Sequence, residues 1–85
     1  MTNSPKITIY STQTCGFCHM LKNYLNSKGI KYDEKKADMD QNLARELYEK
    51  SGQLGVPFTI IEKSDGKEEK ILGFDKPKFD QVLGL

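Results

Sequence analysis

Two cysteines, Cys15 and Cys18, are the residues of this chain whose type and spacing point most directly to chemistry. They lie three positions apart at the expected start of a helix, and this spacing brings two sulfur atoms close enough to form a disulfide. The unpaired N–H groups and the positive dipole end of a helix N-terminus stabilise a thiolate there. We therefore expect Cys15 to attack a substrate disulfide and Cys18, one turn further along, to resolve the resulting mixed disulfide.

The two residues between the cysteines, Gly16 and Phe17, are expected to serve docking. A glycine lets another backbone come close because it has no side chain. We expect Phe17 to point outward and to offer an apolar contact to a substrate. The chain has 2 cysteines in all, and we expect a cytosolic protein, so the pair indicates catalysis or metal binding rather than a framework of structural disulfides.

Length and charge limit the class of protein further. A chain of 85 residues predicts one domain, spanning residues 1–85. Its formal net charge of +1, with acidic and basic residues interspersed, gives no basic face for nucleic acid and no acidic tail. The sequence has no apolar run long enough to cross a membrane, and residues 1–5 lack the apolar core of a signal peptide. We therefore expect a cytoplasmic monomer that binds neither nucleic acid nor a membrane.

The elements that must position the cysteines follow from hydrophobic periodicity and turn signals. Strands are expected at 6–10, 30–37, 57–63 and 68–72, and helices at 16–28, at 40–51 and after Asp75. The strand at 6–10 is β-branched and should be central, whereas the charged strand at 30–37 suits a sheet edge. Asp65 and Gly66 predict a hairpin turn between the last two strands.

The element order is thus β-α-β-α-β-β-α, which predicts an α/β fold. The first strand–helix–strand crossover implies a parallel pair of strands, and the hairpin implies an antiparallel pair. A four-stranded mixed sheet flanked by three helices, with helices on both faces, satisfies both requirements. Four aromatic residues should lie in its core, and Tyr48 should be half exposed; the four are Tyr10, Tyr24, Phe58 and Phe79.

Three motifs in this order resemble the glutaredoxins of the thioredoxin-fold superfamily, specifically the small bacterial dithiol type. They are the Cys15–Cys18 pair after the first strand, Gly55-Val56-Pro57, and Gly73-Phe74-Asp75. The resemblance covers essentially the whole chain. It implies a thioredoxin fold and a dithiol–disulfide oxidoreductase that reduces protein or low-molecular-weight disulfides.

The resemblance also implies a docking groove beside the cysteines. In the family the proline of the second motif follows a cis peptide bond and faces the reactive cysteine, which here would be the Val56–Pro57 bond. The backbone of Val56 would pair with the incoming substrate backbone. From the spacing alone, Pro57 fits the first residue of an edge strand equally well. The substrate-binding residues expected to ring the groove are Phe17, Val56, Pro57, Gly73, Phe74 and Asp75.

The chain departs from the usual glutaredoxin pattern at positions that concern the electron donor. Thr12 stands where the family tends to carry a basic residue that pairs with a glutathione carboxylate, and Phe74 replaces the second glycine of a Gly-Gly pair. Gly73-Phe74 resembles a stretch of the glutaredoxin-like hydrogen donors of ribonucleotide reductase, which take electrons from thioredoxin reductase. The electron donor could therefore be thioredoxin reductase, or glutathione acting as a co-substrate. We expect no tightly bound cofactor and no metal site.

Alternative functions use the same residues. The runner-up is a glutaredoxin that carries an iron–sulfur cluster shared between two subunits, which the small Gly16 permits. The string from Cys15 to His19 also matches the c-type haem attachment signature. The lack of a signal peptide and the expected hairpin disfavour haem attachment. A zinc site would need four ligands, and the chain offers 2 Cys and 1 His. We expect His19 to lie on the helix surface without being essential.

Overall fold

The computed structural model describes residues 5–84, so residues 1–4 and 85 of the predicted domain lie outside the described part. Seven elements follow one another in the predicted order. They are β1 (Lys6–Ser11), α1 (Gly16–Ser27), β2 (Asp33–Lys36), α2 (Gln41–Ser51), β3 (Phe58–Glu62), β4 (Glu68–Leu72) and α3 (Lys76–Leu83).

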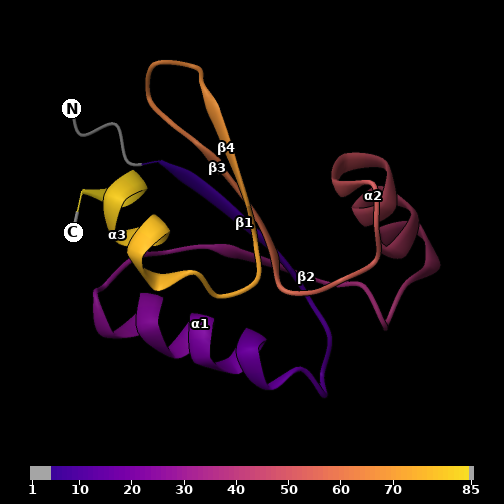
Figure 1. The fold of residues 1–85 in the computed structure, drawn as a ribbon. Coiled ribbons are helices and arrows are strands. Elements are labelled where there is room, and N and C mark those ends of the chain that lie inside the picture. The colour runs from indigo at the N-terminus through magenta and orange to yellow at the C-terminus, as the bar shows by residue number, and fades with distance from the viewer. Residues whose placement is uncertain (1–4, 85) are drawn as a thin grey trace.

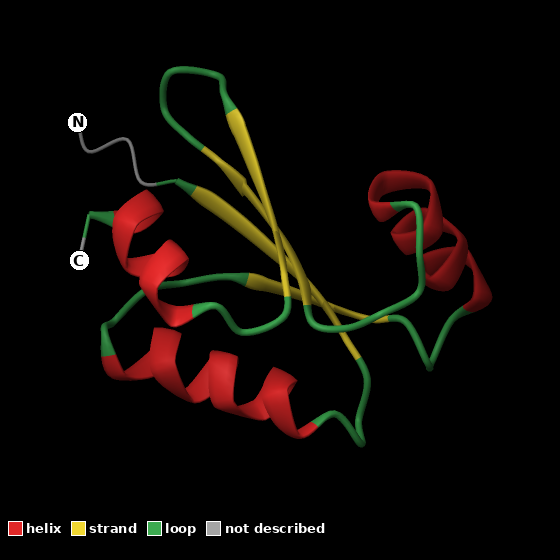
Figure 2. Ribbon diagram, in the orientation of Figure 1, coloured by secondary structure: helices red, strands yellow, loops and turns green. Residues whose placement is uncertain are grey.

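The four strands form one mixed sheet in the order β2-β1-β3-β4 (Figure 2). β1 pairs in parallel with β2, while β3 runs antiparallel to both β1 and β4. The predicted central position of the first strand and edge position of the second are confirmed. The hairpin between β3 and β4 is confirmed as well, with Gly66 at φ 88°, a conformation that favours glycine.

Side-chain alternation along β1 builds a core on each face of the sheet. Ile7 and Ile9 pack with Leu21 and Leu25 of α1 and with Phe79 of α3. Figure 1 shows these two helices on the same side of the sheet and α2 on the other.

On the α2 face, Tyr10 packs with Leu47 of α2 and with Phe58 and Ile60 of β3. The four aromatic residues predicted to be core are all buried. Tyr48 leaves 56% of its surface exposed, as expected for a side chain on the outer part of α2.

The starts of two strands differ from the prediction. β2 starts at Asp33 and not at residue 30, because the backbone N–H of Ile30 donates to the Leu25 carbonyl at 2.9 Å. This bond belongs to the end of α1, so the chain has not yet reached the sheet. β3 starts at Phe58, one residue after Pro57, which has no N–H to offer to a strand ladder.

The starts of α2 and α3 are set by aspartates. The Asp40 carboxylate accepts the backbone N–H of Asn42 at 2.8 Å, and the Asp75 carboxylate accepts that of Lys78 at 3.3 Å. Each cap satisfies an N–H group that has no partner within its helix. α1 begins differently, because its cap residue is a cysteine.

Candidate active site

Cys15 occupies the N-cap of α1. Its backbone is extended, and its Sγ accepts a hydrogen bond from the backbone N–H of Cys18 at 3.1 Å. The start of α1 thus directs a backbone donor at Cys15 Sγ, and a hydrogen bond of this kind is stronger to a charged sulfur than to a neutral one. Both cysteines are free thiols. Cys15 is partly exposed, whereas Cys18 has no exposed surface.

The buried position of Cys18 controls its protonation. Burial, followed by the hydrogen bond with Cys15, raises the pKa of the Cys18 thiol to about 12. A hydrogen bond with the Thr12 backbone and the positive charge of Lys22 act in the opposite direction on this pKa. Cys18 is therefore a protonated thiol at neutral pH, and it needs local stabilisation to act as a thiolate.

Strand register brings three segments to the same end of the sheet as Cys15. Tyr10 pairs with Phe58, and Phe58 pairs with Leu72, so the chain leaving β1, entering β3 and leaving β4 emerges at one end (Figure 2). The backbone N–H of Gly73 donates to the Pro57 carbonyl at 2.7 Å. The peptide bond between Val56 and Pro57 is cis, as the resemblance implied.

The other residues expected in the groove have different surroundings. Phe17, next to Cys15, leaves 63% of its surface exposed. Val56 is partly buried and packs against the core on the α2 face. The backbone at Phe74 follows Gly73, but its ring packs on Tyr24 of α1, with the two ring centroids 5.6 Å apart. The side chain of Phe74 is thus engaged in the α1–α3 core, and the neighbouring Asp75 caps α3.

The turn after β2 holds the loop before Cys15, a contact that sequence reasoning missed. The backbone N–H of Gln13 donates to the Asp38 carboxylate at 3.0 Å, and the Gln13 side-chain amide reaches the sulfur of Met39 at 3.0 Å. His19 Nε2 donates to the Gln13 carbonyl at 3.0 Å. His19 thus lies on the exposed side of α1 and binds the loop. These pairs are 6 to 26 positions apart, so no local pattern predicts them.

A charged network next to Cys18 was missed as well. The hydroxyl of Ser11, which is fully buried, donates to Glu34 Oε2 at 2.6 Å. Lys22 Nζ reaches the same oxygen at 2.8 Å. Burial pushes the pKa of Glu34 upward, but the hydrogen bonds from Lys22 and Ser11 outweigh it and hold that pKa below its usual range. The only sequence signal was the position of Lys22, four residues after Cys18.

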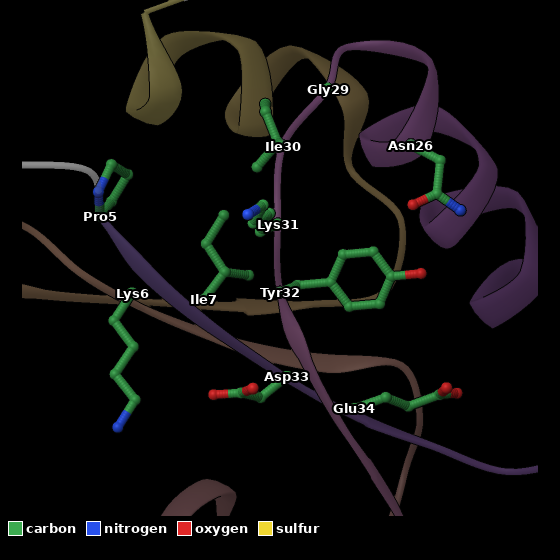
Figure 3. Close-up of a pocket in the computed structure, with 10 residues that line it drawn as sticks. All are labelled: Pro5, Lys6, Ile7, Asn26, Gly29, Ile30, Lys31, Tyr32, Asp33 and Glu34. Atoms are coloured by element: carbon green, nitrogen blue, oxygen red, sulfur yellow. The ribbon is translucent and has the colours of Figure 1, made fainter.

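One pocket lies away from the cysteines. It has a volume of about 850 Å³ and lies between the start of β1, the end of α1 and the segment 29–34 (Figure 3). Its lining includes Lys6, Asn26, Lys31 and Tyr32 but neither cysteine. Cys15 follows the opposite end of β1, so this pocket is not part of the dithiol site.

Two kinds of feature are absent from residues 5–84. No helix there is long and apolar enough to cross a membrane. Within the same residues, no group of three or more His, Cys, Asp or Glu side chains is placed to hold a metal ion.

Comparison with known proteins supports the family resemblance. The family model described as Glutaredoxin matches residues 7–64. A Clostridium pasteurianum protein, described as an uncharacterized glutaredoxin-like 8.6 kDa protein in the rubredoxin operon, is 38% identical over 77 residues, 91% of this chain and 96% of that protein. Glutaredoxin 3 of Escherichia coli K12 is 34% identical over 56 residues, 66% of this chain and 68% of that one.

Solved structures show the same architecture. The methanoredoxin of Methanosarcina acetivorans superposes with a TM-score of 0.77 at 25% identity, over 94% of this chain and 85% of that chain. The predicted thioredoxin fold, with three helices around a four-stranded mixed sheet, is confirmed.

Proposed function

Because the chain belongs to the glutaredoxin family, we propose that it is a thiol–disulfide oxidoreductase that reduces protein or low-molecular-weight disulfides through Cys15 and Cys18. Family membership supports a thiol–disulfide redox function in general. The observation that carries the specific proposal is the hydrogen bond from the Cys18 N–H to Cys15 Sγ at 3.1 Å, with Cys15 accessible and Cys18 buried. This arrangement supports different tasks for the two thiols.

Cys15 performs the first step. Its thiolate attacks one sulfur of the substrate disulfide, so a bond forms between Cys15 Sγ and that sulfur while the substrate S–S bond breaks. The other half of the substrate leaves as a thiolate and takes a proton from water. The N–H groups at the start of α1 stabilise the charge on Cys15 before the attack.

Cys18 performs the second step. It loses its proton, attacks Cys15 Sγ and forms the Cys15–Cys18 disulfide, which breaks the bond between Cys15 and the substrate. The second half of the substrate leaves and takes up the proton. The substrate has then gained two electrons and the protein has lost two, so a donor must reduce the protein again before the next turnover.

The groove supplies the docking contacts. We infer that Phe17 offers an exposed apolar contact and that the backbone of Val56 pairs with the substrate chain. Pro57 and Gly73 are joined by their backbone hydrogen bond of 2.7 Å, which supports their placement in one wall. Phe74 and Asp75 contribute to this wall through their backbone, since their side chains are used by the core and by the cap of α3.

The test is a pair of coupled assays that follow NADPH oxidation with a simple disulfide substrate. One assay supplies thioredoxin reductase and the other supplies glutathione with glutathione reductase. Turnover in either assay supports the proposal and names the donor. Thr12 offers no positive charge for a glutathione carboxylate, so turnover only with thioredoxin reductase would mean that the glutathione site has been lost.

Absence of turnover in both assays would overturn the proposal in favour of the second candidate, a carrier of an iron–sulfur cluster shared between two subunits. The observation that favours this candidate is the open face of Gly16, where an added Cβ would meet no atom within 4 Å. An ultraviolet–visible spectrum of anaerobically purified protein distinguishes the two, because a cluster absorbs visible light and a dithiol does not.

A cytoplasmic location and a monomeric state stay predictions.

A further inference from the structure

A hydroxyl, a carboxylate and an ammonium group form a network that reaches α1 at Lys22, one helical turn after Cys18. Ser11 is the last residue of β1, Glu34 lies in β2, and Lys22 lies in α1. Glu34 Oε2 accepts from Ser11 Oγ at 2.6 Å and from Lys22 Nζ at 2.8 Å. The Lys22 and Glu34 side chains are only 18% and 21% exposed, so this is a largely shielded ion pair.

The topology directs this network to the face of the sheet that carries α1. Glu34 pairs with Ile9 in the parallel register, and side chains of paired residues lie on the same face. Figure 3 shows Glu34 and its neighbour Asp33 pointing in opposite directions from β2. Lys22 comes four residues after Cys18, which places the two side chains on the same side of α1, one turn apart.

We propose that Lys22 is a positioning residue for the resolving step: its ammonium group, held by Glu34, which Ser11 in turn holds, stabilises the Cys18 thiolate while that thiolate attacks Cys15. The inference rests on the proposed dithiol function and adds a residue to it. Lys22 does not touch the substrate, and it acts only through Cys18.

The resolving step shows why a fixed cation helps. The Cys18 thiol releases its proton, the thiolate forms a bond to Cys15 Sγ, and the bond between Cys15 and the substrate sulfur breaks. The departing substrate thiolate takes up the proton, so charge and electrons balance. Forming the negative charge on Cys18 costs free energy, because this side chain has no contact with water.

Several other groups face this site. Cys15 acts on Cys18 from the cap of α1, and it raises the pKa of Cys18, whereas the charge of Lys22 lowers it. From the β2 side, the charge of Tyr32 raises the pKa of Lys22, and the charge of Lys36 lowers the pKa of Glu34.

The hydrogen bond with Glu34 raises the pKa of Lys22, so Lys22 keeps its charge at neutral pH. Glu34 therefore fixes both the place and the protonation state of the cation, while its own charge is shared between two donors. Lys22 is the group that brings a positive charge to Cys18.

The test separates the two chemical steps with dithiodipyridine, an uncharged disulfide that releases one coloured thione in each step. Stopped-flow absorbance then records the attack by Cys15 as the first phase and the resolution by Cys18 as the second. The variant Lys22→Gln removes the charge but keeps an amide that can donate to Glu34, so the carboxylate is not left without a partner. Lys22→Arg restores the charge, and Lys28→Gln removes a charge at the exposed end of the same helix as a matched control.

Lys22→Gln should slow the second phase at neutral pH by about threefold for each unit by which the pKa of Cys18 rises. A rise of one unit lowers the thiolate fraction about tenfold but raises its nucleophilicity about threefold. The second-phase rate increases with pH in all variants, and the Lys22→Gln curve should lie on the alkaline side of the wild-type curve. The first phase should keep its rate, and Lys22→Arg and Lys28→Gln should behave like wild type.

An unchanged second phase in Lys22→Gln would overturn the inference, and so would an equal slowing in Lys22→Arg or Lys28→Gln. The proposed dithiol function would still stand in those cases, because both phases would be present. A wild-type protein that shows no first phase would instead overturn the proposed function and the inference with it. Circular dichroism of each variant checks that the fold is intact.

Discussion

Two similar polar networks start from neighbouring residues of β1 and lie on opposite faces of the sheet. On the α1 face Ser11 donates to Glu34, which also binds Lys22. On the α2 face Tyr10 donates to Glu46, which also binds Lys35 at 2.5 Å.

The two networks differ in their surroundings more than in their chemistry. The Lys35 and Glu46 side chains are 37% and 31% exposed, and neither cysteine lies on their side of the sheet. In the α2-face network, burial and the Glu46 carboxylate raise the pKa of Tyr10, so the phenol stays protonated and joins α2 to the sheet. The α1-face network lies beside a buried thiol. Under our proposal, a hydroxyl, a carboxylate and an ammonium group join packed elements on the α2 face, and a similar set also serves the resolving step on the α1 face.

The largest effect is expected when the attacking thiol at the start of α1 is removed. Cys15→Ser removes the nucleophile but leaves both networks intact, so turnover in the coupled assays should fall to background while the free energy of unfolding changes little. Measured turnover and urea denaturation of the same preparation check this expectation. Retained turnover would show that Cys15 is not the attacking group.

Ser11→Ala tests whether the α1-face network affects the resolving step. The substitution removes the buried donor to Glu34, so Lys22 is held less firmly beside Cys18. The second phase with dithiodipyridine should slow, though less than in Lys22→Gln, and the protein should lose about 1 kcal/mol of stability, the usual net value of one hydrogen bond. If stability falls while the second phase keeps its rate, the network serves packing alone on this face too.

Tyr10→Phe is the matched change on the α2 face, and its kinetic effect should be the smallest. The ring stays in the core and only the hydrogen bond to Glu46 is lost, so stability should fall by about 1 kcal/mol. Both phases with dithiodipyridine should keep their wild-type rates. A slower second phase in this variant would contradict the division of tasks between the two faces.

Local patterns were sufficient for much of the fold and for the reactive pair. Cys15 and Cys18 are close in sequence, and the cap position follows from the start of the helical period. The apolar alternation in β1 and the turn at Gly66 gave the centre of the sheet and the hairpin. The cis bond before Pro57 followed from the family resemblance, since spacing alone left two possibilities.

Features that depend on register or on packing between helices escaped sequence reasoning. Glu34 was one charge among several in an expected edge strand, and only its pairing with Ile9 shows that it faces Lys22. Phe74 was expected at the groove, and the place of its ring depends on how α1 and α3 pack together, which no local pattern encodes.

The most direct test of the proposed dithiol mechanism uses Cys18→Ser with dithiodipyridine. The account predicts the first phase without the second, and a stable mixed disulfide that peptide mass spectrometry locates on Cys15. The failure to form any adduct, or the formation of an equally fast adduct on Cys18 in the Cys15→Ser variant, would contradict the assignment of Cys15 as the nucleophile and Cys18 as the resolving thiol.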